Sequence, residues 1–393
     1  MNPEDFKQPS GQVKRVGEGQ AAYWSFVPNP LPPQLDWDLA LAQELSKADR
    51  ALGELAGLGR TIPNPHLLIQ PFLRREAVLS SRIEGTQTDI ADLYVYEAGQ
   101  LPLPGVKMPP PESDVREVLN YVRALEYGLQ RLDKLPVSLR LIREVHERLM
   151  KGVRGEQATP GEFRTRQNWI GATGVTLNGA SFVPPPVEEM HEVLGAFEKY
   201  LYEDDPTPPL ARLAYIHYQF EAIHPFIDGN GRIGRLLLIL LLVHWNLLPL
   251  PLLYLSAYFE RNRQQYYDLL MAVSQKSAWR EWLVFFLRGV QEQSFDAAQR
   301  GKRLQDLQIN WQGRLAGIRS ARALQLMNSL FGIPYVTIPQ AAKMLKVTYR
   351  TAETTVQRLV EVKILKQMGK DSYNKTFAAH EILEIVLENQ VER

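Results

Sequence analysis

The stretch HPFIDGNGRIGR, from His224 to Arg235, lies between two segments with different helical patterns. Before it, apolar side chains recur at helical spacing, and after it an unbroken apolar run extends to Val243. The stretch is therefore predicted to be a loop between two helices, with Gly231 near the start of the second helix. The apolar run predicts that this second helix is buried at the centre of a mainly helical domain.

The composition of the loop is that of an anion-binding site. Residues 228–231 (DGNG) combine a permissive backbone with amide groups at the start of a helix. The first N–H groups of a helix lack partners within the helix, and the helix dipole adds positive potential there. Arg232 and Arg235 are three residues apart, so both guanidinium groups can face one anion.

Two further side chains supply chemistry to this loop. Asp228 is a hard oxygen ligand suited to Mg²⁺, which in phosphate sites uses one or two carboxylates plus phosphate oxygens. His224 has the side chain whose ordinary pKa suits general-base catalysis near neutral pH. Taken singly, Asn230-Gly231 is a turn and His224 a core histidine. Their combination favours a site for phosphoryl-type transfer, which needs mainly positioning and charge stabilisation.

Overall composition narrows the class of protein. The chain has 393 residues, 45% of them hydrophobic, and a formal net charge of +1. These values exclude a largely disordered chain and a strongly basic or acidic molecule, so any nucleic-acid contact requires a local patch. A cysteine count of 0 excludes disulfides, thiolate metal sites and a cysteine nucleophile, and we expect a reducing cytoplasmic location.

One segment approaches the length of a membrane span. Residues 236–255 (LLLILLLVHWNLLPLPLLYL) are mostly apolar, but His244, Asn246, Pro249 and Pro251 interrupt the run. A buried helix followed by a proline-rich turn is the better interpretation. Residues 1–15 are polar and lack a signal-peptide core. We expect a soluble protein with no membrane partner.

The pattern along the chain predicts three regions with the boundaries 1–113, 114–300 and 311–393. The first is proline-rich and irregular to about Leu35, becomes helical from Asp36, and ends in a proline-rich segment at residues 101–113. An amphipathic helix is predicted to begin at Asp114, and helical periodicity then dominates to about Gln308.

One segment of the middle region breaks the helical pattern. Residues 166–183 (RQNWIGATGVTLNGASFV) are rich in glycine, asparagine and β-branched residues. They are predicted to form a β-hairpin or an irregular flap, since Gly174 and Asn178-Gly179 adopt positive φ at little cost.

The last region has the order of elements of a winged helix. Helices are predicted at residues 338–345 and 349–362, and strands at 364–368 and 375–378 flank the turn GKDSYN. The second of these helices could place Tyr349, Arg350, Gln357 and Arg358 against DNA. Glu353 and Glu361 weaken a phosphate-driven contact, so a protein partner or dimer contact remains open.

The loop motif resembles the signature of the Fic family, His-x-Phe-x-(Asp/Glu)-Gly-Asn-Gly-Arg-x-x-Arg, and every specified position matches. The resemblance extends from the N-terminal helices through GEFRTRQNWIG to Tyr266-Tyr267, and the last region resembles the winged helix of many bacterial members. It implies a mainly α, helical Fic fold with a β-hairpin flap and a C-terminal winged-helix domain.

The resemblance also implies an activity: a protein adenylyltransferase that moves AMP from ATP to a Tyr, Thr or Ser hydroxyl, releasing pyrophosphate. His224 would deprotonate the target hydroxyl and Asp228 would hold Mg²⁺. The phosphates would contact Gly229, Asn230, Gly231, Arg232 and Arg235. The phosphorylating Doc-type relatives have lysine in place of this Arg232, so the loop is of the nucleotidyl-transferring kind.

Upstream, LSSRIEG at residues 79–85 resembles the inhibitory motif of the family, (Ser/Thr)-x-x-x-Glu-(Gly/Asn). Ser80 and Glu84 lie one helical turn apart, and Gly85 can end the helix. The resemblance implies that Glu84 pairs with Arg235 and so keeps this arginine from the γ-phosphate. The alternative is a solvated glutamate at a surface helix end.

Two other assignments come from the resemblance. Ile170 and Gly171 are predicted to lie on a target-docking flap, where an edge strand pairs with an extended segment. Tyr266 and Tyr267 are predicted to line an adenine pocket, although tyrosines at this spacing are more often core residues. Where relatives often place asparagine, this chain has Ala272-Val273-Ser274, which leaves selectivity for the base open.

Other functions and partners remain open at this stage. A DNA-binding regulator that uses the Fic domain as a nucleotide sensor is one alternative, and transfer of UMP is another. The expected partners are ATP, a protein target that can be the chain itself, and a second copy in a homodimer. The target, the modified residue and any AMP removal are not determined by the sequence.

Overall fold

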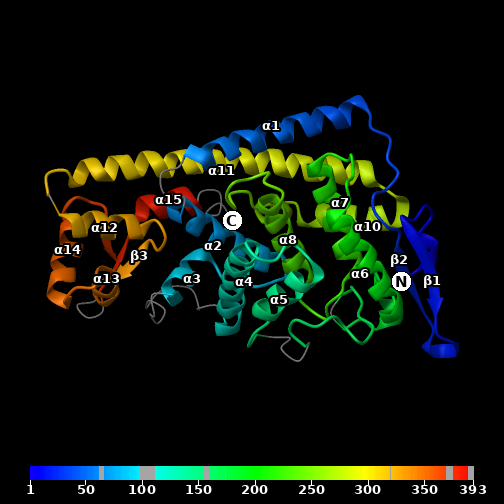
Figure 1. Ribbon diagram of the computed structural model, residues 1–393. Helices are drawn as coiled ribbons and strands as arrows, with labels where there is room; N and C mark the ends of the chain where they lie inside the picture. Colours follow the sequence, from blue (N-terminus) through cyan, green and yellow to red (C-terminus); the bar gives the residue numbers. More distant parts are fainter. Residues whose placement is uncertain are drawn as a thin grey trace. The chain divides into compact units, whose positions relative to one another are not determined.

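The computed structural model describes residues 1–61, 66–97, 111–153, 159–172, 174–318, 320–368 and 375–387 (Figure 1). The chain forms two compact units. The first unit contains residues 1–53, 120–247 and 255–293, and the second contains residues 54–119, 248–254 and 294–393.

Helices dominate the first unit. Helix α7 packs against the helices α6, α8 and α10 and against strand β2, and α5 packs on α8. Their bounds are α5 (Leu139–Leu149), α6 (Val187–Tyr202), α7 (Pro209–Ile223), α8 (Asn230–His244), α9 (Ser256–Arg261) and α10 (Arg263–Lys276). The prediction of a loop between two helices at residues 224–229 is confirmed.

Helix α8 is the buried centre of this unit. Its apolar side chains from Ile233 to Leu242 are nearly inaccessible to solvent, as the unbroken run predicted. The helix ends at His244, and turns and bends follow to Pro251. Among the described residues, none of the helices is both long and apolar enough to cross a membrane.

The prediction that residues up to Leu35 are irregular is wrong. Strands β1 (Gly11–Val16) and β2 (Tyr23–Pro28) pair antiparallel, and β2 packs against α6 and α7. The side chain of Phe26 is fully buried. The proline-rich pattern suggested irregular structure, but Pro30, Pro32 and Pro33 follow the strands, and Gly17 and Gly19 adopt positive φ in the connection between them.

Residues 166–183, apart from residue 173, form an irregular flap rather than a regular hairpin. A single antiparallel bridge joins Ile170 to Phe182, and a short 3₁₀ helix covers Leu177–Gly179. Of the predicted turn residues, Gly174 has a positive φ of 84°. The Asn178-Gly179 pair lies in the 3₁₀ helix, so it does not make the tight turn that would continue the ladder.

The second unit includes the helices α2 (His66–Ile83) and α3 (Ile90–Glu97), which pack together, and α15 (His380–Leu387) packs on α2. Its C-terminal part has the predicted helices and the two predicted strands in order, and in addition a strand, β3, that was not predicted. The bounds are α12 (Ala321–Leu330), β3 (Tyr335–Thr337), α13 (Ile338–Leu345), α14 (Tyr349–Glu361), β4 (Lys366–Met368) and β5 (Thr376–Ala378).

The strands of this part form an antiparallel sheet in the order β3-β5-β4. Thr337 caps α13 through a reciprocal capping box with Gln340, which accounts for the predicted start of that helix. The turn GKDSYN lies outside the described residues, as does most of the proline-rich segment 101–113. The assignment as a winged helix stays a prediction.

Three helices contribute residues to both units: α1 (Leu39–Thr61), α4 (Glu112–Arg131) and α11 (Trp279–Leu315). Helix α4 begins two residues before the predicted Asp114. Helix α11 continues past the predicted end at Gln308, so residues 301–310 between the second and third predicted regions are helical. The predicted domain boundaries stay a prediction.

Candidate active site

The candidate base, His224, ends helix α7 in the left-handed region, with φ of 48° and ψ of 60°. This conformation costs a residue other than glycine roughly 1–3 kcal/mol. The surrounding contacts hold it: the His224 N–H donates to the Phe220 carbonyl, and the His224 carbonyl accepts hydrogen bonds from Arg164 and Asn168.

The ring of His224 has a defined orientation. Its Nδ1 lies 3.2 Å from the carbonyl oxygen of Glu221. Because a carbonyl only accepts, Nδ1 carries the proton in this contact. In the neutral ring Nε2 then has a lone pair, which is the form that a general base requires.

Arg164 and Asn168 brace the backbone of the loop, and neither was singled out from the sequence. Arg164 is fully buried, and it donates from Nε to the His224 carbonyl at 3.0 Å and from Nη2 to the Pro185 carbonyl at 2.5 Å. Asn168 donates to the carbonyls of His224 and Phe226 at 3.1 and 2.8 Å. Burial lowers the pKa of Arg164 to about 10, so its charge persists at neutral pH.

Asn230 closes the loop on itself. Its Oδ1 accepts from the Phe226 N–H and its Nδ2 donates to the Phe226 carbonyl, both at 2.8 Å. The Asn230 side chain therefore holds both backbone groups of Phe226, and its predicted contact with phosphate stays a prediction. The ring of Phe226 is fully buried.

The N-terminus of α8 has the backbone geometry of an anion-binding site. Gly229 caps the helix with φ of 80°, and a Cβ there would lie 2.9 Å from Met150 Sδ. Both the backbone conformation and the space therefore require glycine. Asn230, Gly231 and Arg232 form the first turn, whose N–H groups point along the helix axis toward the loop.

Asp228 presents an exposed carboxylate directly before the start of α8. Its side chain is 49% exposed, and Oδ1 accepts a hydrogen bond of 2.6 Å from the Gly229 N–H. The described residues contain no group of three or more metal-ligating side chains. One exposed carboxylate beside an anion site fits Mg²⁺, which takes its other oxygens from phosphates and water.

The two arginines of the motif are both buried, at 3% exposed for Arg232 and 2% for Arg235. Arg232 Nη2 lies 3.5 Å from Asp228 Oδ1 and 3.7 Å from Met150 Sδ, so it faces the carboxylate side of the loop. Arg235 is near His217, whose pKa falls to about 3 through burial first and then through the charge of Arg235. The shared role of the two arginines in binding phosphates stays a prediction.

The predicted adenine contacts differ in exposure. Tyr266 is 1% exposed, its ring stacks on Phe259, and its hydroxyl lies 2.8 Å from His217 Nε2. Tyr267 is 38% exposed, and Arg263 lies over its ring. Tyr267 is thus the accessible ring and Tyr266 supports it from the core. Their contact with adenine stays a prediction.

The predicted flap contacts lie on the surface. Ile170 is 40% exposed and its N–H and carbonyl both pair with the Phe182 segment. Gly171 is exposed beside it, and Trp169 is 43% exposed. The Trp169 ring was not predicted, although a tryptophan next to Ile170 was visible in the sequence. Target docking stays a prediction.

The predicted inhibitory residues lie at the end of α2. Ser80 is fully buried within the helix, whereas Glu84 is exposed just beyond Ile83. Gly85 has a φ of 100°, so glycine ends this helix as predicted. Ser80 and Glu84 belong to the second unit and Arg235 to the first. The pairing of Glu84 with Arg235 stays a prediction.

Comparison with known families now identifies the fold around this loop. Residues 136–242 match the Fic/DOC family, and residues 42–130 match the N-terminal region of the same family. The chain thus contains a Fic/DOC family domain at residues 136–242, preceded by the N-terminal region of that family at residues 42–130. The first match contains the entire loop and also His146, Arg164 and Asn168.

Curated relatives and solved structures agree with this assignment. The chain is similar to proteins named protein adenylyltransferase Fic: 31% identity over 39% of this chain and 28% of the relative in Drosophila persimilis, and 27% over 49% and 41% in Nematostella vectensis. It therefore spans well under half the length of these relatives.

Among solved structures, a Fic family protein from Desulfovibrio desulfuricans G20 has a TM-score of 0.57 at 18% identity, covering 89% of this chain and 98% of that one. Fic-1 from C. elegans has a TM-score of 0.51 at 21% identity, covering 68% and 74%. These two likenesses show that the Fic fold is shared.

Proposed function

We propose that the chain transfers AMP from ATP to a hydroxyl group of a protein side chain and releases pyrophosphate. The observation that carries this proposal is the orientation of His224. Its Nδ1 donates to the Glu221 carbonyl, so the neutral ring has its lone pair at Nε2, on the loop that leads into the N-terminus of α8. The complete Fic motif and the names of the curated relatives support the same reaction.

In the proposed transfer, one bond to the α-phosphorus forms and one breaks. His224 Nε2 takes the proton of the target hydroxyl, and the hydroxyl oxygen forms a bond to the α-phosphorus while the bond from that phosphorus to the β-phosphate oxygen breaks. The helix α8 N-terminus and the two arginines bind the phosphate oxygens electrostatically. Asp228 would hold Mg²⁺, which supplies charge neutralisation of the phosphates when bound.

The test follows transfer of AMP labelled at the α-phosphate. His224→Ala is expected to lose incorporation altogether, since the proposed base is then missing. His224→Asn serves as a second variant, because asparagine tolerates the left-handed backbone and the loop then keeps its shape. Full labelling by both variants would reject His224 as the base, and labelling by γ-phosphate instead of α-phosphate would reject AMP transfer.

We also propose that Glu84 inhibits the reaction by competing for Arg235. Support comes from the motif in residues 79–85, which occurs in the same chain as the complete loop motif 224–235. Glu84→Gly is expected to raise self-modification, and Glu84→Gln is expected to raise it as well, since the negative charge is what attracts the arginine. Glu54→Gln, at an exposed glutamate on α1, is the matched control.

Equal labelling by wild type, Glu84→Gly and Glu54→Gln would contradict the inhibition. The same variants test a reverse reaction: if Glu84 orients water, AMP-modified wild-type protein loses its label faster than the AMP-modified Glu84→Gln variant does. Labelled ATP and UTP offered in competition would test selectivity for the nucleotide. We propose ATP, because the curated relatives are named adenylyltransferases.

For the protein target, we propose docking on the flap through Ile170 and Gly171. The exposed Ile170 side chain and its neighbour Trp169 give this edge an apolar surface. Ile170→Ser is expected to lower labelling of an added protein substrate more than it lowers nucleotide binding. Equal loss of both would show that the variant damages the site itself.

A second candidate function, DNA binding, rests on charge around α14. The exposed face of α14 carries Tyr349, Arg350, Gln357 and Arg358, with Glu353 and Glu361 between them. Over residues 338–368, the exposed basic side chains outnumber these two glutamates; they are Lys343, Lys346, Arg350, Arg358, Lys363 and Lys366. This local excess suits phosphate contacts despite a net charge of +1 for the chain.

A mobility shift of a mixed-sequence duplex at physiological salt tests this candidate. The combined Arg350→Ala and Arg358→Ala variant is expected to bind at least tenfold more weakly, and Arg322→Ala on α12 is the control. A shift that is absent in wild type, or unchanged in the combined variant, would exclude DNA binding through α14. We further propose a homodimer and a cytoplasmic location, to be tested by analytical ultracentrifugation and by cell fractionation.

A further inference from the structure

A buried histidine outside the motif, His146, contacts the loop between α7 and α8. His146, on α5, is fully buried, and both of its ring nitrogens bind backbone groups. The Gly161 N–H donates to Nδ1 at 2.9 Å, and Nε2 lies 3.0 Å from the Asp228 carbonyl oxygen. Because an amide only donates and a carbonyl only accepts, the proton is on Nε2, which donates to Asp228.

Packing fixes this ring as firmly as the hydrogen bonds do. The rings of His146 and Phe226 stack with centroids 3.7 Å apart and an angle of 5° between their planes. A Cβ on Gly229 would lie 3.4 Å from His146 Nε2. The histidine therefore lies against the loop at Phe226, Asp228 and Gly229, on both sides of the proposed metal ligand.

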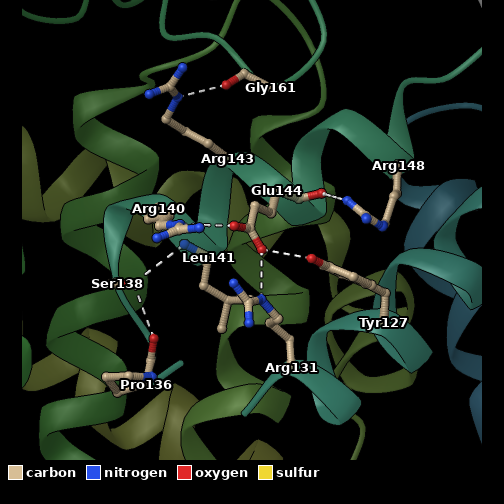
Figure 2. A network of polar contacts seen from close by, with 10 residues as sticks. All are labelled: Tyr127, Arg131, Pro136, Ser138, Arg140, Leu141, Arg143, Glu144, Arg148 and Gly161. Atoms are coloured by element: carbon tan, nitrogen blue, oxygen red, sulfur yellow. Dashed lines mark hydrogen bonds and ion pairs between the residues drawn. The ribbon is translucent and has the colours of Figure 1, made fainter. Parts of the chain in front are cut away.

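The other partner of His146 is anchored too. Gly161 has a φ of 82°, and its carbonyl accepts a hydrogen bond of 2.7 Å from Arg143 Nε (Figure 2). With the bond from its N–H to His146, both of its polar backbone groups therefore bind side chains of α5. This contact fixes the acceptor nitrogen and, through it, the proton that faces Asp228.

We propose that His146 is a positioning residue that sets the direction of the Asp228 carboxylate by holding the Asp228 carbonyl. The Asp228 side chain bonds the next amide, Gly229 N–H, so its direction follows the peptide that His146 holds. Without the Nε2 contact this peptide can rotate, and the carboxylate no longer points at one fixed place. The proposal rests on the proposed function for the role of Asp228 toward Mg²⁺.

A histidine that only fills the core predicts a different pattern, and three variants separate the two. His146→Asn keeps an acceptor near the Nδ1 position for Gly161 and loses the donor to Asp228. His146→Gln places a donor near the Nε2 position and loses the acceptor for Gly161. His146→Phe keeps a ring against Phe226 and loses both hydrogen bonds.

The measurement is the binding of a fluorescent ATP analogue to the full chain carrying Glu84→Gly, titrated with Mg²⁺, alongside the midpoint of thermal unfolding. His146→Asn is expected to need at least tenfold more Mg²⁺ for half-maximal tightening, with nucleotide affinity in EDTA unchanged. His146→Gln is expected to need the wild-type amount of Mg²⁺ although it unfolds at a lower temperature. His146→Phe is expected to show both defects.

Two outcomes would overturn the proposal. One is a Mg²⁺ requirement that follows the unfolding temperature across the three variants, which is the behaviour of a residue with a structural role alone. The other is an unchanged Mg²⁺ requirement in His146→Asn. Because nucleotide binding is measured without transfer, a chain that binds Mg²⁺ and ATP but labels no hydroxyl would reject the proposed function and leave this test intact.

Discussion

The two faces of helix α5 carry polar side chains that do different work. On the buried face, His146 binds backbone groups of two loops, and Met150 lies just beyond the helix beneath Gly229. On the outer face, Glu144 accepts hydrogen bonds from Tyr127 and Arg131 of α4 and from Arg140 of its own helix (Figure 2). Residues only two positions apart therefore belong to two separate networks.

The two networks differ in the groups that they join and in their exposure to solvent. The outer network joins side chains that remain partly exposed, with 22% of Glu144 and 70% of Arg140 accessible. Such pairs contribute about 0–1 kcal/mol, because solvent screens them and the long side chains lose freedom. The inner network joins buried side chains to backbone carbonyls, and an unpaired buried acceptor costs about 1–3 kcal/mol. We expect loop geometry to depend on the inner network.

The largest effect is expected at Arg164. Like His146, this buried side chain binds backbone carbonyls, those of His224 and Pro185, so its removal tests the difference between buried and exposed contacts. Arg164→Met keeps much of the aliphatic volume but leaves the Pro185 carbonyl without the Arg164 hydrogen bond. We expect the free energy of unfolding to fall by about 1–3 kcal/mol. We also expect AMP transfer to fall at least tenfold, because the left-handed His224 loses one of its two side-chain braces.

Arg140→Met is the matched control, since it removes an arginine from the exposed face of α5. Chemical unfolding and labelling with AMP are measured on both variants. If the two variants changed transfer equally, the buried braces would have no special part in holding the loop.

The next test concerns the space under the loop. Gly229→Ala and Gly174→Ala both place a Cβ at a positive φ, of 80° and 84°, which costs roughly 1–2 kcal/mol in each case. Only at Gly229 does the new Cβ meet a neighbour, Met150 Sδ at 2.9 Å, whereas Gly174 has nothing within 4 Å. We expect equal backbone penalties but a loss of nucleotide binding in Gly229→Ala alone.

Combining Gly229→Ala with Met150→Ala separates the two causes further. The added space is expected to restore nucleotide binding in part and to leave the backbone penalty. Isothermal titration with ATP gives the affinity, and chemical unfolding gives the stability. Loss of nucleotide binding in Gly174→Ala as well would mean that the contact beneath Gly229 is not what matters.

The sequence revealed the parts of this site that depend on local pattern. The loop 224–235, the buried helix after it, and the helix bounds at Ile338–Leu345 follow from periodicity, caps and glycine positions. The braces do not. His146 lies 82 residues from Asp228 and Arg164 lies 60 residues from His224, and each binds a backbone carbonyl that every residue type offers.

The hairpin β1–β2 was missed for a related reason. Its alternation of side chains is short, and the prolines after it gave a stronger local signal. What supports β2 is packing on α6 and α7 and the hydrogen bond from Phe26 N–H to Val183, which are contacts between distant segments. Patterns in a single sequence contain no direct record of such contacts.

The smallest expected effect is on the outer network. Hydrogen bonds from Arg131 and then from Tyr127 lower the pKa of Glu144 from 4.5 to about 2. Because the pKa is lower in the folded state, the stabilisation is present above the ordinary pKa of glutamate and is lost as pH falls from about 4.5 toward 2. Glu144→Gln should remove this pH dependence and lower stability at pH 7 by at most about 1 kcal/mol.

AMP transfer and nucleotide binding are expected to stay at wild-type values in Glu144→Gln, since none of the loop's described contacts involves this side chain. Unfolding curves between pH 2 and pH 7 measure the first effect, and labelling with AMP measures the second. If the variant kept its stability profile but lost AMP transfer, both faces of α5 would belong to one functional network. The separation between His146 and Glu144 would then have to be given up, because a change at the exposed carboxylate would have reached the loop through the helix itself.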